Sequence, residues 1–143
     1  MEESLTYLKE QFELPDVDVK SYSPLVLAYI GDGIYELVIR TAVVGQGNRQ
    51  ANALHKKTST YVKASAQAAM MEAILEDLTE EEQAVYKRGR NAKTVSMAKH
   101  ATMHDYRHAT GFEALMGYLY LTDQMKRLID LVKLGMERTE GMP

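Results

Sequence analysis

The longest run of hydrophobic positions lies between Pro24 and Val44 and predicts the central helix of the chain. Apolar side chains recur there at the three- and four-residue spacing of a helix face. Further apolar residues fill most of the other positions, so the pattern predicts a helix buried nearly all round, in the middle of a core. Ser23 supplies an N-cap before the proline, and the breaker run Gly45–Asn48 ends the helix.

Two local preferences are overridden in the middle of this helix. Asp32 is flanked by Gly31 and Gly33, and Glu36 follows one turn later. An interior glycine costs about 1 kcal/mol relative to alanine. A half-buried carboxylate costs more unless it is paired or bound to a cation. Function is expected at such a place. The same charges, together with Arg40, exclude a membrane span.

The rest of the chain predicts further helices and no strand. A long segment without apolar periodicity, Asn91–His104, predicts a basic loop. The fold class is therefore predicted to be all-α, with a single domain over residues 1–143 and about six or seven helices. The other expected helices are Met1–Phe12, two helices from Gln50 divided near Thr58–Thr60, Thr79–Arg90 with a capping box, one beginning at His104, and Asp123–Glu137.

Charge is distributed unevenly along the chain. The net charge is only −3, but Tyr86–His108 carries six Lys and Arg residues against one Asp, a net +5, and the remainder carries −8. A basic segment on an acidic chain indicates nucleic-acid binding, although an ordinary solvated face is the simpler alternative. The candidate RNA-binding residues are Lys87, Arg88, Arg90, Lys93 and Lys99, with Lys56 and Lys57 as weaker candidates.

The chain contains no cysteine, which excludes a disulfide framework and a thiolate metal site. Its acidic N-terminus lacks the basic start and apolar stretch of a signal peptide. A cytoplasmic location is therefore expected.

A second carboxylate lies in another apolar helical stretch. Glu113 follows Gly111 in the run GFEALMGYLYL. Small residues let helices approach closely, and converging Asp32 and Glu113 side chains would offer the oxygen ligands that Mg²⁺ prefers. On spacing alone, the simpler interpretation is that each acid pairs with a basic residue such as Arg40 or Arg107.

Several runs of the sequence resemble those of a known family. LAYIGDGIYEL resembles the ribonuclease III signature, and FEALMGYLYL is similar to the second acidic helix of that family. The runs LHKK at 54–57, KRGRNAK at 87–93 and YR at 106–107 extend the resemblance to the Mini-III ribonucleases. The length and the lack of a downstream double-stranded-RNA-binding domain fit the same group. The resemblance implies a ribonuclease III endonuclease-like helical bundle.

The resemblance also implies a function. It implies a magnesium-dependent endoribonuclease that hydrolyses a phosphodiester of double-stranded RNA and leaves a 5′-phosphate and a 3′-hydroxyl. Asp32 and Glu113 are the implied catalytic residues and Mg²⁺ ligands. A homodimer whose two sites each cut one strand is expected, acting in maturation of 23S ribosomal RNA precursor.

Two positions depart from the larger enzymes of the family. They carry acids where this chain has Ala28 and Thr110, so two carboxylates of a four-carboxylate constellation remain. Weaker binding of free Mg²⁺ is expected as a result. A non-catalytic helical RNA-binding module is the alternative function, and the retained Asp32–Glu113 pair favours the enzyme. Glu36 fits a supporting role equally well and is not assigned to catalysis.

Overall fold

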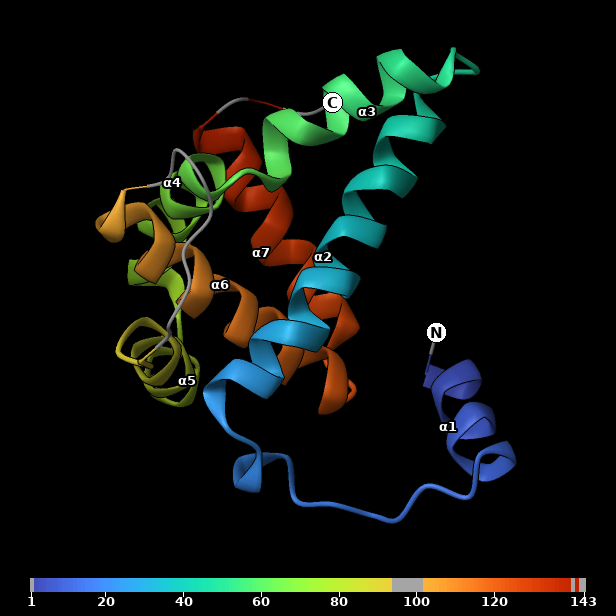
Figure 1. Ribbon diagram of the computed structural model, residues 1–143, viewed down its shortest axis with the longest axis vertical. Helices are drawn as coiled ribbons and strands as arrows, with labels where there is room; N and C mark the ends of the chain where they lie inside the picture. Colours follow the sequence, from blue (N-terminus) through green and yellow to red (C-terminus); the bar gives the residue numbers. More distant parts are fainter. Residues whose placement is uncertain (1, 94–101, 140, 142–143) are drawn as a thin grey trace.

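The computed structural model describes residues 2–93, 102–139 and 141. Within them the chain forms seven α-helices and two short 3₁₀ helices, with no strand, so the all-α class is confirmed (Figure 1). The elements are α1 (Glu2–Gln11), η1 (Val19–Ser21), α2 (Pro24–Gly45), α3 (Ala51–Val62), α4 (Ala64–Ile74), η2 (Leu75–Asp77), α5 (Glu80–Arg90), α6 (Met103–Leu121) and α7 (Met125–Arg138).

Helix α6 is the centre of the bundle. Helices α2, α4 and α5 all pack against it, and α7 packs mainly against α4 (Figure 1). Its apolar stripe is fully buried and consists of Phe112, Leu115, Met116 and Leu119. The helix that carries Glu113 is therefore held from several sides, which fixes the backbone from which this side chain projects.

The expectation that α2 is buried all round is wrong for this chain. Its inner face is buried, with Leu27, Ile34, Ile39 and Val43 almost inaccessible to solvent, but a second apolar face is open. Leu25, Val26, Tyr29, Leu37 and Val44 are 40–81% exposed. The hydrophobic pattern marks residues that avoid water, and the described elements of this chain cover only one side of the helix.

Two glycines bring α2 and α6 into backbone contact. A Cβ atom built on Gly31 would overlap the Glu113 carbonyl oxygen and lie 2.8 Å from the Gly117 backbone nitrogen. A Cβ atom on Gly117 would overlap the Leu27 carbonyl oxygen. Any larger side chain would push the two helices apart. The expected close approach at Gly31 is confirmed, whereas Gly33 faces open space.

Most helix boundaries fall where capping signals place them. Ser23 caps α2, Thr79 forms the predicted capping box of α5, and Thr102 caps α6. The predicted division near Thr58–Thr60 is wrong: α3 continues through these residues to Val62, the division lies at Lys63, and the Thr60 hydroxyl donates to the Lys56 carbonyl oxygen within the helix. Residues 94–101 of the expected basic loop lie outside the described residues.

Helix α1 lies at the edge of the bundle, to which an extended segment joins it, and its Leu5 and Leu8 line a cavity with Ile30 of α2 and Tyr120 of α6 (Figure 1). Leu5 is buried, but Leu8 and Phe12, which follow it at helical spacing, are 43% and 71% exposed. No helix in the described part of the chain has the length and apolar character that crossing a membrane requires.

Candidate active site

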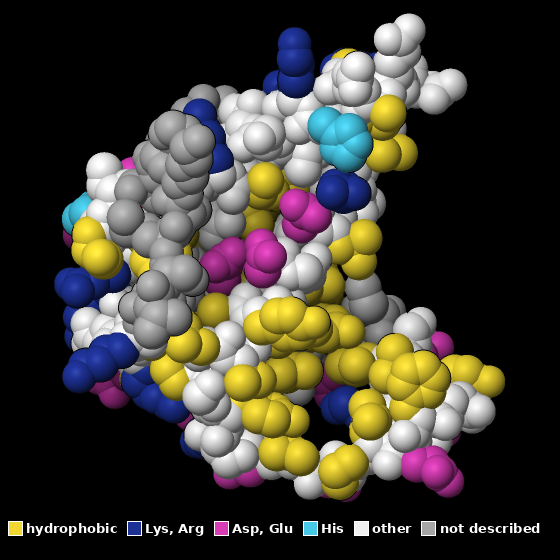
Figure 2. Space-filling model, viewed as in Figure 1, with side chains coloured by type: hydrophobic (Ala, Val, Ile, Leu, Met, Phe, Trp, Pro, Cys, Tyr) yellow, Lys and Arg dark blue, Asp and Glu magenta, His cyan; other side chains and the backbone are white. Residues whose placement is uncertain are grey.

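The carboxylates of Asp32 and Glu113 come together where α2 crosses α6. Asp32 is exposed, and Glu113 is half-buried against the bundle. The glycine contact at Gly31 determines how near the two helices can lie at this level. Acidic side chains gather at the centre of this face of the molecule, over α2 and α6 (Figure 2). The two candidate metal ligands, although far apart in the sequence, are therefore adjacent in the fold.

The neighbouring carboxylates perturb each other. Burial, a hydrogen bond with Asp32 and the negative charge of Asp32 raise the pKa of Glu113 from 4.5 to about 8, and the amide of Gln67 opposes this shift. Because burial and the nearby Asp32 carboxylate disfavour its ionised form, the Glu113 carboxyl group is largely protonated near neutral pH. A divalent cation would replace that proton and relieve the repulsion.

Within residues 2–93, 102–139 and 141, no basic side chain neutralises the pair. Across the described residues, neither Asp32 nor Glu113 forms an ion pair with a Lys, Arg or His. Arg40 instead lies 3.1 Å from the carboxylate of Glu36, one turn along α2. The simpler interpretation, an ordinary ion pair for each acid, does not hold for the described residues. The donor set fits a hard cation, which prefers carboxylate oxygens.

A third polar residue at the site was not predicted from the sequence. Gln67 of α4 is only 2% exposed, and its Nε2 donates to Glu113 Oε2 at 3.5 Å and to the Val62 carbonyl oxygen at 2.8 Å. The one signal in the sequence is that Gln67 is the sole polar residue in the run AQAAMM.

Comparison with known proteins assigns this pair of acidic helices to a family. Residues 25–124, well over half of the chain, match the Ribonuclease III domain. The chain belongs to the ribonuclease III family.

Proteins called Mini-ribonuclease 3 are similar over most of its length. The one from Enterococcus faecalis is 53% identical over 117 residues, which cover 80% of this chain and 89% of that protein. The one from Thermoanaerobacter is 47% identical over 141 residues, covering 98% and 99%. A Fusobacterium nucleatum crystal structure is 31% identical, covers 85% of this chain and 98% of its own, and has a TM-score of 0.76. The expected kinship with the Mini-III ribonucleases is confirmed, and the chain is an endoribonuclease.

Ala28 and Thr110, the two departures from the larger ribonuclease III enzymes, are both buried. Ala28 is buried on the inner face of α2. Thr110 is also buried, and its hydroxyl donates to the Tyr106 carbonyl oxygen at 2.9 Å, one turn back in α6. Neither position offers a carboxylate to the site, so within the described residues Asp32 and Glu113 are its two acids.

The candidate RNA-binding residues occupy two places in this ribonuclease III fold. Lys56 and Lys57 lie in α3, and the Lys57 Nζ stands 5.8 Å from the ring centroid of Tyr61. The second group lies in and just beyond the last turn of α5 and consists of Lys87, Arg88, Arg90 and Lys93. Lys99 lies outside the described residues.

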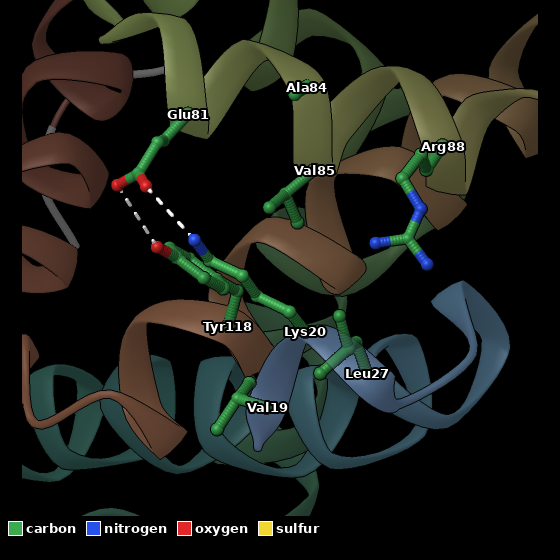
Figure 3. A pocket seen from close by; sticks show the side chains of 8 residues that line it. All are labelled: Val19, Lys20, Leu27, Glu81, Ala84, Val85, Arg88 and Tyr118. Carbon is green, nitrogen blue, oxygen red and sulfur yellow. Dashed lines mark hydrogen bonds and ion pairs between the residues drawn. The ribbon is translucent and has the colours of Figure 1, made fainter.

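Within the second group, the Arg88 side chain is directed toward η1. It donates to the Tyr22 carbonyl oxygen at 3.4 Å and lines a cavity of about 220 Å³ between η1, α2, α5 and α6. Figure 3 shows its guanidinium beside this cavity, with Lys20 and Glu81 at the other side. Arg90 instead lies 5.5 Å from the ring centroid of Tyr86. Neither Asp32 nor Glu113 lines this cavity.

Proposed function

We propose that the chain is a magnesium-dependent endoribonuclease that cleaves double-stranded RNA. The observation that carries the proposal is the Asp32–Glu113 pair, two adjoining carboxylates without an ion-pair partner among the described residues. Such a pair is costly for stability and suits a divalent cation. The alternative, a non-catalytic RNA-binding module, does not account for two adjacent carboxylates, because they repel each other and also repel RNA phosphates.

Asp32 and Glu113 are the residues that would hold Mg²⁺. A bound Mg²⁺ ion would polarise a phosphoryl oxygen and lower the pKa of the attacking water. Because the pKa of Glu113 is raised to about 8, its carboxyl group must give up a proton before it can serve as an anionic ligand. With two acids in place of four, the scissile phosphate contributes much of the remaining charge. Hydrolysis leaves a 5′-phosphate and a 3′-hydroxyl.

The basic residues supply the contacts with the RNA backbone. Double-stranded RNA presents phosphates and 2′-hydroxyls across a wide, shallow groove, and contacts with these groups do not require a particular sequence. The group at the end of α5 suits this role because Lys87, Arg88 and Lys93 are exposed where the helix stops, and Arg90 is partly exposed beside them. Lys56, Lys57 and Lys99 belong to the same proposed set.

Removing the basic group should weaken binding without removing catalysis. In a variant with Lys87, Arg88, Arg90 and Lys93 all changed to alanine, each lost phosphate contact should reduce the slope of log affinity against log salt by nearly one. Affinity should fall most at low salt, and turnover at saturating RNA should fall much less. Salt-dependent binding to a plain duplex measures the effect.

A triple alanine variant of the exposed residues Lys9, Lys126 and Lys133 is the control. An unchanged slope would make the segment an ordinary solvated surface.

A homodimer fits the open apolar face of α2. That helix carries Asp32 and also exposes large hydrophobic side chains, and Figure 2 shows such side chains spreading from the acidic cluster over the same face. A second copy related by two-fold symmetry would cover this face and place two sites on one duplex, one for each strand.

Dimerisation predicts a strong effect of Tyr29, which is 81% exposed. Burying a tyrosine contributes about 2 kcal/mol, so Tyr29→Ser should raise the dimer dissociation constant at least about tenfold. Sedimentation over a concentration series measures it. Tyr7→Ser, at a residue 63% exposed on α1, is the control and should change little. A fully active wild-type monomer at micromolar concentration would contradict the dimer.

The proposed setting is the cytoplasm, where the enzyme would mature 23S ribosomal RNA precursor. The decisive assay uses purified protein and a plain RNA duplex, with Mg²⁺ or with a chelator. Cleavage should require Mg²⁺, should spare single strands of the same sequence, and should leave ends that carry a 5′-phosphate. Binding without cleavage under all metal conditions would favour the non-catalytic module instead.

A further inference from the structure

A buried amide stands beside the catalytic pair and is tied to the backbone. Gln67 lies on α4, where its neighbours Ala66, Ala68 and Met70 fill space with apolar side chains. One N–H of its amide donates to the Val62 carbonyl oxygen at 2.8 Å, and Nε2 also lies 3.5 Å from Glu113 Oε2. A primary amide has two N–H groups, so it can serve both acceptors at once.

The orientation of this amide is determined by what surrounds it. Turning the group over would set Gln67 Oε1 against the Val62 carbonyl oxygen, which has no proton to donate. In the observed orientation, Oε1 is buried without a hydrogen-bond partner among the described residues. An unpartnered buried oxygen costs free energy. A residue that only filled the core would be apolar, like its neighbours.

The backbone anchor of Gln67 is itself firmly held. Val62 ends α3, and the carbonyl oxygen of the preceding residue, Tyr61, accepts a hydrogen bond from the Tyr35 hydroxyl at 2.8 Å. The Tyr35 ring packs edge-on against Phe112 with centroids 5.0 Å apart, and Phe112 directly precedes Glu113. The corner between α3 and α4 is therefore fixed to both acidic helices, α2 through Tyr35 and α6 through Gln67.

We infer that Gln67 is a positioning residue that holds the Glu113 carboxylate ready for a divalent cation. The inference rests on the proposed function. An N–H donated to one carboxylate oxygen restrains the rotation of the Glu113 side chain and leaves the other oxygen for the ion. It also stabilises the ionised carboxylate that the ion requires. Residues that hold ligands in this way typically change metal affinity 10–100-fold when they are lost.

The test is Gln67→Met, which keeps the length of the side chain and removes both donors. The Mg²⁺ concentration for half-maximal cleavage should rise about tenfold, whereas the rate at saturating Mg²⁺ should change less than about threefold. Binding of Mn²⁺ without RNA, measured by electron paramagnetic resonance, should weaken by a similar factor. The melting temperature should change little, because removal of the unpartnered oxygen offsets the lost hydrogen bond to the Val62 carbonyl oxygen. Gln83→Met, at a partly buried position of α5, is the matched control.

Gln67→Asn is the second variant, since a side chain shorter by one methylene cannot reach both Val62 and Glu113. It should weaken Mn²⁺ binding in the same direction. Unchanged metal dependence in folded Gln67→Met would overturn the inference and leave the proposed enzyme intact. Activity lost only in proportion to folded protein, in both variants, would assign Gln67 a purely structural role and would also overturn it. A wild-type protein that neither binds Mn²⁺ nor cleaves RNA would instead remove the proposed function.

Discussion

Asp32→Asn is expected to reduce Mg²⁺-dependent cleavage of duplex RNA at least about a thousandfold while the protein stays folded. The substitution keeps the volume of the side chain and removes one of the two charges that would hold the ion. It also removes the repulsion against Glu113, so stability should be equal to or higher than that of the wild type. Single-turnover cleavage at saturating RNA measures the rate, and thermal unfolding checks the fold.

Glu36→Gln provides the control for this prediction. Glu36 lies one turn from Asp32 on the same helix, but its carboxylate is paired with Arg40 at 3.1 Å. Loss of this half-exposed pair should cost little, and cleavage should remain within about threefold of the wild type. An Asp32→Asn variant that cuts at a near wild-type rate, or a Glu36→Gln variant as inactive as Asp32→Asn, would show that the assignment of the ligands is wrong.

Glu113→Gln is expected to abolish cleavage and to stabilise the protein in alkaline buffer. Because the pKa of Glu113 is raised from 4.5 to about 8, the folded state binds more protons than the unfolded state between these values. The free energy of unfolding therefore falls as the pH rises through this window. The amide of the Glu113→Gln variant does not ionise, so the variant does not lose stability in this way. The gain should be about 2 kcal/mol at pH 8, less than the full shift implies because Glu113 is partly exposed.

The pH dependence identifies the cause of the stabilisation. In metal-free buffer, Glu113→Gln should raise the melting temperature by about 5 °C at pH 8 and by almost nothing at pH 4. Glu76→Gln, at an exposed residue of η2, should give no such pH-dependent gain. A gain of equal size at both pH values would mean that better packing stabilises the variant, and not the removal of a carboxyl group that ionises unfavourably in the folded state.

Much of the helical architecture could be predicted from local signals. Ser23, Thr79 and the breaker after α2 place helix ends because capping acts within a single turn. The burial of α2 could not be predicted in the same way, since a hydrophobic pattern does not say whether the same chain or another covers a given face. Tyr29 and Leu37 satisfy the pattern and are still exposed.

The candidate site was predictable only in part. Asp32 and Glu113 could be singled out because each interrupts an apolar helix, and Gly31 indicated that another backbone comes close. Gln67 could not be assigned a role, because its partners are brought to it by the corner between α3 and α4, a feature of tertiary packing. The direction of Arg88, toward the Tyr22 carbonyl oxygen, likewise depends on where η1 lies.

Direct binding of Mn²⁺ tests most simply whether Asp32 and Glu113 together hold a divalent cation. Electron paramagnetic resonance of free Mn²⁺ at pH 8.5, where Glu113 is largely ionised, would compare the wild type with Asp32→Asn, Glu113→Gln and Glu36→Gln. The wild type and Glu36→Gln should bind Mn²⁺ with similar affinity, and each of the other two should lose at least about tenfold. Equal binding by all four proteins would mean that Asp32 and Glu113 do not hold the cation.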